Sequence, residues 1–155
     1  MQQLNFHNYA FRYRNDGNKT SIFDEIRKKF VILTPEEWVR QHVVQFLIVE
    51  KRYPKSLVNV EKLLRINGRI KRYDIVVFNP DGSIFILVEC KAPEIKINQS
   101  TFDQIACYNM IMQSELLMVS NGQQHYFCKM DYDNEKYDFL DALPAFATTS
   151  SSIDS

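Results

Sequence analysis

The sequence has few of the features that mark secreted, membrane or zinc-binding proteins. Only three of its 155 residues are cysteines, Cys90, Cys107 and Cys128, and no two of them form a C-x-x-C pair. An odd number without that spacing argues against a disulfide framework and against a zinc site. Met1 to Ala10 has no apolar core of a signal peptide, and no hydrophobic run is long enough to cross a membrane. We therefore expect a cytoplasmic protein with reduced cysteines.

The chain has no net charge, since 19 basic residues balance 19 acidic ones, but the two signs are unevenly distributed. Residues 1–100 contain 17 Lys and Arg against 11 Asp and Glu, a balance of +6, and residues 101–155 contain 2 against 8, a balance of −6. A neutral chain with this asymmetry can present a positive surface to a polyanion such as a nucleic acid. Ordinary solvated charged faces explain the same pattern equally well.

Turn residues and hydrophobic periodicity indicate one α/β domain, which we place at residues 1–142, followed by a polar tail at 143–155 that we expect to be disordered. Thr34-Pro35-Glu36-Glu37 is a strong helix start, because Thr34 can cap the helix and proline suits its first position. The predicted helices cover residues 35–51 and 99–112. The predicted core strands cover 57–66, 73–78, 84–91, 116–119 and 125–130, with 136–140 as a last strand or short helix, and an N-terminal β-hairpin joins strands at 11–14 and 29–33.

The stretch from Lys71 to Pro93 combines two strand patterns with the turn Asn79-Pro80-Asp81-Gly82. Because side chains alternate along a strand, we expect this hairpin to bring Asp74 beside Glu89 and Lys91, with Cys90 pointing away. Three ionisable groups on one buried face are unusual, since an unpaired buried charge is costly. A structural salt bridge of Lys91 with one of the carboxylates is one explanation. The other is a divalent metal site, because carboxylate oxygens suit Mg²⁺ and a nearby lysine can orient an attacking water.

Asp74, followed after fourteen residues by Glu89-Cys90-Lys91, resembles the D…ExK core of the PD-(D/E)xK nuclease superfamily, although Tyr73 replaces the proline that often precedes the aspartate. The strings V-E-C-K-A-P, T-F-D-Q-I-A-C-Y-N and S-N-G resemble the N-terminal nuclease domain of type I restriction enzyme motor subunits, and this similarity extends over about residues 10 to 140. The resemblance implies a restriction-endonuclease-like core, in which helices flank a central mixed sheet. It also implies a magnesium-dependent deoxyribonuclease.

The resemblance assigns roles to individual residues of this chain. Asp74, Glu89 and the backbone carbonyl of Cys90 would bind Mg²⁺, for which Mn²⁺ can substitute, and Lys91 would position the water. Glu36 matches the glutamate of the first helix that reaches the metal site in related nucleases. From the residues alone, we interpret Glu37 as a charge that favours the helix dipole. Glu61 has two interpretations, a salt bridge at the strand end, which we favour, and an accessory carboxylate of the site.

Two further groups of residues are candidates for DNA contact. Gln104 and Tyr108 are helix neighbours at i and i+4, and they resemble the Q-x-x-x-Y motif of RecB-type nucleases and type I motor subunits. Without that resemblance, such a pair is typical of a partly exposed helix face. Arg72 belongs to a basic cluster around the favoured hairpin turn Asn67-Gly68, and such a cluster can contact phosphates.

The expected partner is double-stranded DNA. Because the sequence contains no Walker A or helicase motif, we also consider a separate motor or specificity subunit as a partner, while a monomer and a homodimer both remain open. The alternative to an enzyme is a catalytically silent nucleic-acid-binding or docking module, since a fold does not by itself provide an activity.

Overall fold

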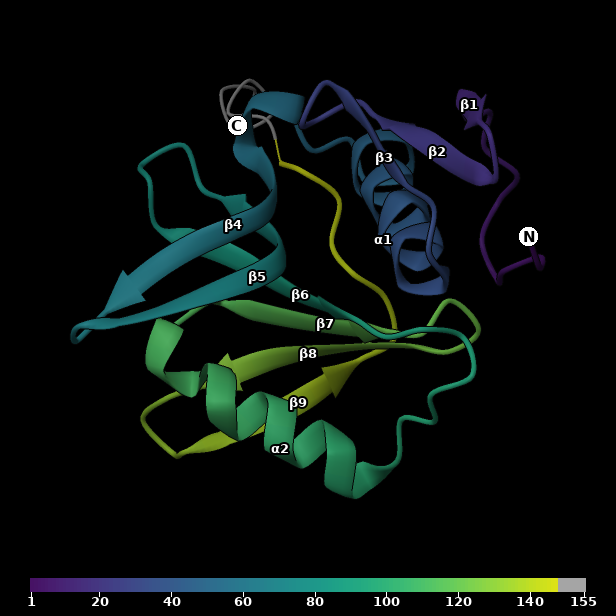
Figure 1. Cartoon of the computed structure of the whole chain (residues 1–155). Helices are drawn as coiled ribbons and strands as arrows, with labels where there is room; N and C mark the ends of the chain where they lie inside the picture. Colours follow the sequence, from purple (N-terminus) through teal and green to yellow (C-terminus); the bar gives the residue numbers. More distant parts are fainter. Residues whose placement is uncertain (148–155) are drawn as a thin grey trace.

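The computed structural model describes residues 1–147, which form two sheets and two α-helices (Figure 1). The larger sheet has six strands in the order β4-β5-β6-β7-β8-β9, and only β6 and β7 are parallel. The predicted α/β architecture with a mixed sheet is therefore confirmed. The elements are β1 (Tyr13–Asp16), β2 (Lys19–Asp24), β3 (Lys29–Ile32), α1 (Pro35–Gln45), β4 (Val58–Ile66), β5 (Arg69–Phe78), β6 (Ile84–Cys90), α2 (Gln99–Asn109), β7 (Leu116–Ser120), β8 (His125–Asp131) and β9 (Lys136–Leu140).

The two helices cover opposite faces of the larger sheet (Figure 1). Val43 of α1 belongs to one apolar cluster with Ile75 and Val88, whereas Phe102 of α2 belongs to a second cluster with Leu87. Adjacent residues of one strand thus contact different helices, as the pleat of a buried strand requires. Within the described residues, no helix is long and apolar enough to cross a membrane.

The predicted helix starts and ends agree with the structure except in the last turns. The Thr34 hydroxyl accepts a hydrogen bond of 3.0 Å from the Glu37 amide, so the expected N-cap is present. After α1 the chain continues as a π-helical turn at Phe46–Glu50, and after α2 as a 3₁₀ turn at Met110–Met112. These turns account for the longer helices expected from the sequence.

The N-terminal addition is a three-stranded sheet rather than the hairpin that the sequence predicted. Residues 19–24, which lie between the two predicted strands, form its central strand β2. Ile22 of β2 is fully buried in the cluster that contains α1. The helix α1 lies between the small sheet and the large one (Figure 1). The side chains of α1 are therefore enclosed on both sides.

The folded domain extends past residue 142. Leu143 is buried, the carbonyl of Pro144 accepts a hydrogen bond of 2.6 Å from the Tyr53 hydroxyl, and the Phe146 amide donates to the Lys51 carbonyl at 2.8 Å. Residues 143–147, which the sequence assigned to a tail, thus pack on the domain. The rest of that predicted tail, 148–155, lies outside the described residues.

The burial of β2 predicts how strongly the small sheet contributes to stability. Ile22→Ala should lower the free energy of unfolding by about 2–4 kcal/mol, because the side chain leaves a cavity in the core. Ile32→Ala on the neighbouring strand β3 is the matched control, since Ile32 is exposed, and it should change stability by less than about 0.5 kcal/mol. Urea unfolding of both variants measures the difference. Equal values would show that the small sheet does not share the core.

Candidate functional site

The end of the β5–β6 ladder brings the two predicted carboxylates close together. The last register pair at this end joins Ile75 to Val88, and Asp74 and Glu89 are the next residues on the two strands. The Cys90 amide donates a hydrogen bond of 2.9 Å to Oδ2 of Asp74. The Asp74 carboxylate therefore accepts from a backbone N–H where the β5–β6 ladder ends, which helps to fix its position.

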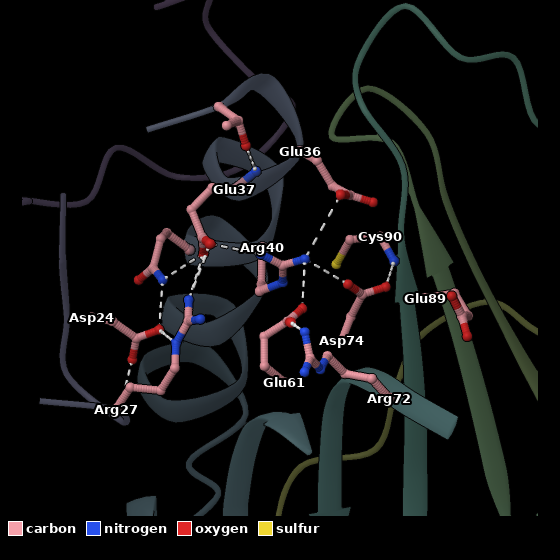
Figure 2. Close-up of polar contacts among 12 residues, drawn as sticks. Asp24, Arg27, Glu36, Glu37, Arg40, Glu61, Arg72, Asp74, Glu89 and Cys90 are labelled. Atoms are coloured by element: carbon pink, nitrogen blue, oxygen red, sulfur yellow. Dashed lines mark hydrogen bonds and ion pairs between the residues drawn. The ribbon is translucent and has the colours of Figure 1, made fainter. Parts of the chain in front are cut away.

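The two carboxylates turn toward different helices, which corrects the expectation that they share one face with Lys91. Oδ1 of Asp74 accepts a hydrogen bond of 2.7 Å from Nη2 of Arg40 on α1. Oε1 of Glu89 accepts from Nζ of Lys71 at 3.2 Å, and Glu89 lines a pocket beside α2. Figure 2 shows Asp74 directed toward Arg40 and Glu89 on the far side of the strand. The expectation that Glu89 and Lys91 share a face agrees with the structure, because both line that pocket.

A local distortion of β4 explains part of this arrangement. Val60 packs in the cluster of α1 and Leu64 packs against the cluster of α2, although strict alternation would place both on one face. Between them Glu61 has a φ of +54°, in the left-handed region that non-glycine residues seldom occupy. Such strain persists only where the surroundings favour it, and it is frequent at functional sites.

The same break in alternation occurs on β5. Ile75 packs with α1, but Tyr73, two residues earlier, packs in the cluster of α2. Asp74 lies between these two residues and is opposite Glu61, because the register pairs on either side are Val60–Ile75 and Lys62–Tyr73. Both strands therefore turn a carboxylate toward α1 at the same level of the sheet.

The guanidinium of Arg40 lies among four carboxylates (Figure 2). Its Nη2 is 2.7 Å from Asp74, 3.0 Å from Glu61 and 3.8 Å from Glu36, and its Nη1 is 2.6 Å from Glu37. The side chain is only 8% exposed. Burial lowers the pKa of Arg40, but the hydrogen bond to Asp74 and the charges of Glu37 and Asp74 raise it by more, so its pKa lies above the ordinary value. Arg40 is therefore a fixed positive charge inside an acidic cluster.

Glu37 has a larger role than the helix-dipole charge that the sequence suggested. Both of its carboxylate oxygens accept from Nη2 of Arg27 at 3.0 Å, and Oε2 also accepts from the Gln41 amide at 3.0 Å. Arg27 and Gln41 in turn bind Asp24 of the small sheet. Glu37 is buried, and these partners stabilise its carboxylate in the buried site. It connects the small sheet to Arg40.

Glu36, the predicted helix glutamate, lies at the open edge of the cluster. Its side chain is 49% exposed, and its carboxylate is still within ion-pair distance of Arg40. Burial and the negative charge of Asp74 raise the pKa of Glu36, whereas the charges of Arg40 and Lys91 lower it. Glu36 is thus an exposed member of the cluster around Arg40.

A pocket of about 700 Å³ separates the end of β6 from α2. Its lining includes the predicted Glu89 and Lys91 from the strand end, and the predicted Gln104 and Tyr108 from the helix. Tyr108 is 59% exposed, so its ring is accessible to a ligand. The remaining lining residues are Lys71, Ile105, Cys107 and Asn109. The structure thus brings together two motifs that lie more than a dozen residues apart in the chain.

Lys71 is a member of this pocket that the sequence indicated only as part of a basic cluster. Its Nζ is 3.7 Å from the ring centroid of Tyr108 and 4.7 Å from that of Tyr73, both within the range of a cation–π interaction. The same ammonium donates to Glu89. Lys71 therefore links β5, β6 and α2 at one point. The sequence K-R-Y-D includes Lys71, but no pattern in it predicts the contacts of Lys71 with Glu89 and Tyr108.

The donor atoms of this region suit a divalent cation, although the side chains are engaged with cations of the chain itself. Burial and the charge of Asp74 raise the pKa of Glu89, against the opposing effects of Lys71 and Lys91. The negative charges of Asp74 and Glu89 disfavour each other, and a bound cation would relieve that repulsion. Carboxylate oxygens are also the ligands that Mg²⁺ prefers. With Asp74 held by Arg40 and Glu89 by Lys71, no three His, Cys, Asp or Glu side chains of residues 1–147 are arranged to enclose a metal ion.

The β4–β5 hairpin projects from the sheet and forms a basic arm, which we define as residues 62–72 (Figure 1). Its Lys71 lines the pocket. The basic arm contains five Lys and Arg and no acidic residue. Arg65 and Arg69 near its tip are exposed. Arg72 is exposed as well, and its Nη1 is 3.5 Å from Glu61. That contact also confirms the salt bridge expected for Glu61, which the structure extends to Arg40.

Comparison with known proteins relates most of the chain to restriction enzymes. The chain is 31% identical over 117 residues to a protein of Borreliella burgdorferi named as transcription elongation factor GreA, a match that covers 70% of this chain and 12% of that protein. It is also similar to the fragment structure of an HsdR subunit of a type I restriction enzyme from Vibrio vulnificus YJ016, at 19% identity and a TM-score of 0.49, over 73% of this chain and 24% of that one.

The chain therefore spans only a small part of the length of either relative. Residues 35–144, which include α1, the six-stranded sheet and α2, match the family described as type I restriction enzyme R protein N terminus. The chain belongs to this family of type I restriction enzyme R protein N-terminal domains.

Proposed function

We propose that this domain is a metal-dependent DNA endonuclease with a PD-(D/E)xK core, of the kind found at the N terminus of type I restriction R subunits. The observation that carries the proposal is the shared pocket of Glu89, Lys91, Gln104 and Tyr108. It joins the E-x-K strand end to the Q-x-x-x-Y helix, with Asp74 on the adjacent strand. The family match of residues 35–144 supports the same class of protein.

Asp74, Glu89 and the carbonyl of Cys90 are the proposed ligands of Mg²⁺, which Mn²⁺ can replace. A metal ion bound there would polarise the scissile phosphate and lower the pKa of a bound water. Glu89 accepts from Lys71 and Asp74 from Arg40, so each carboxylate would exchange that contact for the metal ion. The Asp74 Oδ2 contact with the Cys90 amide can hold the carboxylate in place during that exchange.

Lys91 is the proposed group that positions the attacking water. Its positive charge opposes the rise in the pKa of Glu89 and of Glu36 that burial and Asp74 cause. An ammonium at this point can hold a water by its oxygen and offset the charge that develops on the phosphate. The attacking water gives up a proton to solvent as its oxygen forms a bond to phosphorus, one P–O ester bond breaks, and the leaving oxygen takes up a proton from solvent. Glu36, at the solvent edge, can hold that water or a second ion.

Double-stranded DNA is the proposed substrate. Gln104 can hydrogen-bond a phosphate or base edge, and the exposed ring of Tyr108 can stack on a base. Arg72 and the rest of the basic arm extend a positive surface away from the pocket, where it can contact the phosphate backbone. Membership in an R-protein family supports action together with a separate motor or specificity subunit.

The first test replaces each proposed catalytic group by a side chain of similar size. Asp74→Asn, Glu89→Gln and Lys91→Met should each abolish Mg²⁺-dependent nicking of supercoiled plasmid while the protein remains folded, because the first two remove a charge that binds the metal ion and the third removes the charge that positions the water. Glu94→Gln, an exposed carboxylate shortly after β6, is the control and should cleave like the wild type. Cleavage at the wild-type rate by the three site variants would refute the assignment. A wild type that binds DNA but never cleaves it would instead identify a silent binding module.

Gln104 and Tyr108 should affect DNA rather than metal, since an amide and a phenol are poor ligands for Mg²⁺. Replacing both with Ala should weaken DNA binding by about 1–3 kcal/mol if one base stack is lost. DNA affinity is measured in Ca²⁺ to prevent turnover, and the metal-induced rise of the thermal midpoint is measured beside it. That rise should be the same as in the wild type. If it disappears while DNA affinity is unchanged, the two residues support the metal site instead.

The basic arm should contribute a salt-dependent part of DNA affinity. Arg65→Gln with Arg69→Gln should weaken binding to all sequences and reduce the slope of log affinity against log salt by about 2, one for each lost phosphate contact. Lys19→Gln with Lys29→Gln removes the same charge from the small sheet and is the matched control, since both lysines are exposed. Equal losses in the two double variants would mean that only net charge matters.

A further inference from the structure

Arg40 takes the place of a cation beside Asp74. Its Nη2 donates to Asp74 Oδ1 at 2.7 Å, a carboxylate oxygen that the proposed metal would need. A divalent ion and a guanidinium cannot both lie against the same oxygen without strong repulsion. Binding of the metal to Asp74 therefore requires that Arg40 moves away.

The structure provides Arg40 with a second set of partners. Nη1 is 2.6 Å from Glu37, and Nη2 is also 3.0 Å from Glu61. Neither Glu37 nor Glu61 lies on β6 or in the pocket with Glu89. The guanidinium could leave Asp74 and keep both of these contacts, so it would remain paired in the buried site, where an unpaired charge is costly.

The backbone of Glu61 indicates that this second set is built into the fold. Glu61 lies inside a strand with a φ of +54°, and this conformation turns its carboxylate from the regular alternation toward Arg40. A left-handed backbone is unfavourable for a residue with a side chain, because its Cβ approaches the following carbonyl oxygen. A strained residue of this kind at the centre of a charged cluster points to a positional role rather than to a chance surface pair.

We propose that Arg40 is a positioning residue that neutralises Asp74 in the metal-free protein and withdraws onto Glu37 and Glu61 when a divalent cation binds Asp74. This inference rests on the proposed metal site. Asp74 is then paired with the Arg40 guanidinium in the metal-free protein and with the divalent ion in the metal-bound protein. The metal can therefore leave without unfolding of the site and without protonation of Asp74. The exchange of one cation for another also weakens metal binding, because the binding-competent state is populated only while Asp74 is free of Arg40.

The test measures Mn²⁺ binding by calorimetry, together with the thermal midpoint with and without Mn²⁺. Arg40→Gln should lower the midpoint of the metal-free protein, since its carboxylates lose their counterion, and should tighten Mn²⁺ binding at least about fivefold. Arg27→Gln is the matched control. Arg27 is a partly buried arginine of the same network that pairs with Glu37 but not with Asp74. It should lower the midpoint and leave Mn²⁺ affinity near that of the wild type.

Glu61→Gln separates this role from that of a direct metal ligand. With one alternative partner lost, Arg40 should stay on Asp74, and Mn²⁺ binding should weaken. In the Arg40→Gln background the same Glu61→Gln change should leave Mn²⁺ affinity unchanged, because there is no guanidinium with which Glu61 could pair. The non-additivity of the two changes measures the coupling between Arg40 and Glu61. An equal weakening in both backgrounds would show that Glu61 ligates the metal and would overturn the proposal.

Other outcomes are equally decisive. If Arg40→Gln binds Mn²⁺ no more tightly than the wild type, Arg40 does not compete with the metal and the proposal is wrong. If Arg40→Gln does not fold, Arg40→Lys replaces it. A lysine ammonium has one nitrogen in place of the two Nη groups by which Arg40 contacts Glu37 and Asp74 separately, so this variant should also tighten Mn²⁺ binding. If Asp74→Asn binds Mn²⁺ as well as the wild type, or the wild type does not bind it, the proposed metal site itself fails. That result is distinct from a failure of the exchange.

Discussion

The ion cluster around Arg40 is the interaction on which the arrangement of the candidate site depends. Four carboxylates, from Glu36, Glu37, Glu61 and Asp74, lie within 4 Å of one buried guanidinium. Without that charge they would repel one another, and their burial would be unfavourable. Arg40 thereby ties α1 to β4 and β5, and the turn of the Asp74 side chain toward α1 follows from that connection.

On each face of the sheet, a basic side chain pairs with the proposed carboxylate ligand of that face. On the side of α1 the cation is Arg40, and on the side of α2 it is Lys71, which binds Glu89 and lies over the ring of Tyr108. Each of the two proposed carboxylate ligands is thus paired with a basic side chain of the chain itself. These pairs offset part of the cost of burying the acidic groups, since an unpaired buried charge is far less favourable.

The position of the site also depends on layers that contain none of its proposed catalytic residues. The small sheet reaches Arg40 through Asp24, Arg27 and Glu37, so its loss would remove partners from the centre of the cluster. Residues 143–147 cover the other end of the α1 cluster through Leu143 and the hydrogen bonds to Tyr53 and Lys51. These outer segments therefore belong to the support of the site as well as to the core.

Helices, strands and turns that are specified by neighbouring residues could be predicted from the amino-acid sequence. The cap of α1 at Thr34, the Asn67-Gly68 turn and the apolar runs of β5 to β8 depend on neighbouring residues, and all were predictable. The D…ExK and Q-x-x-x-Y patterns likewise identified the strand end and helix that meet at the pocket. The remaining features depend on contacts between residues that are distant in the chain. The left-handed conformation of Glu61 and the turn of Asp74 toward α1 are stabilised by Arg40, which lies more than twenty residues away in the chain. The central strand of the small sheet and the packing of Leu143 likewise depend on burial against α1, a contact that no local pattern encodes.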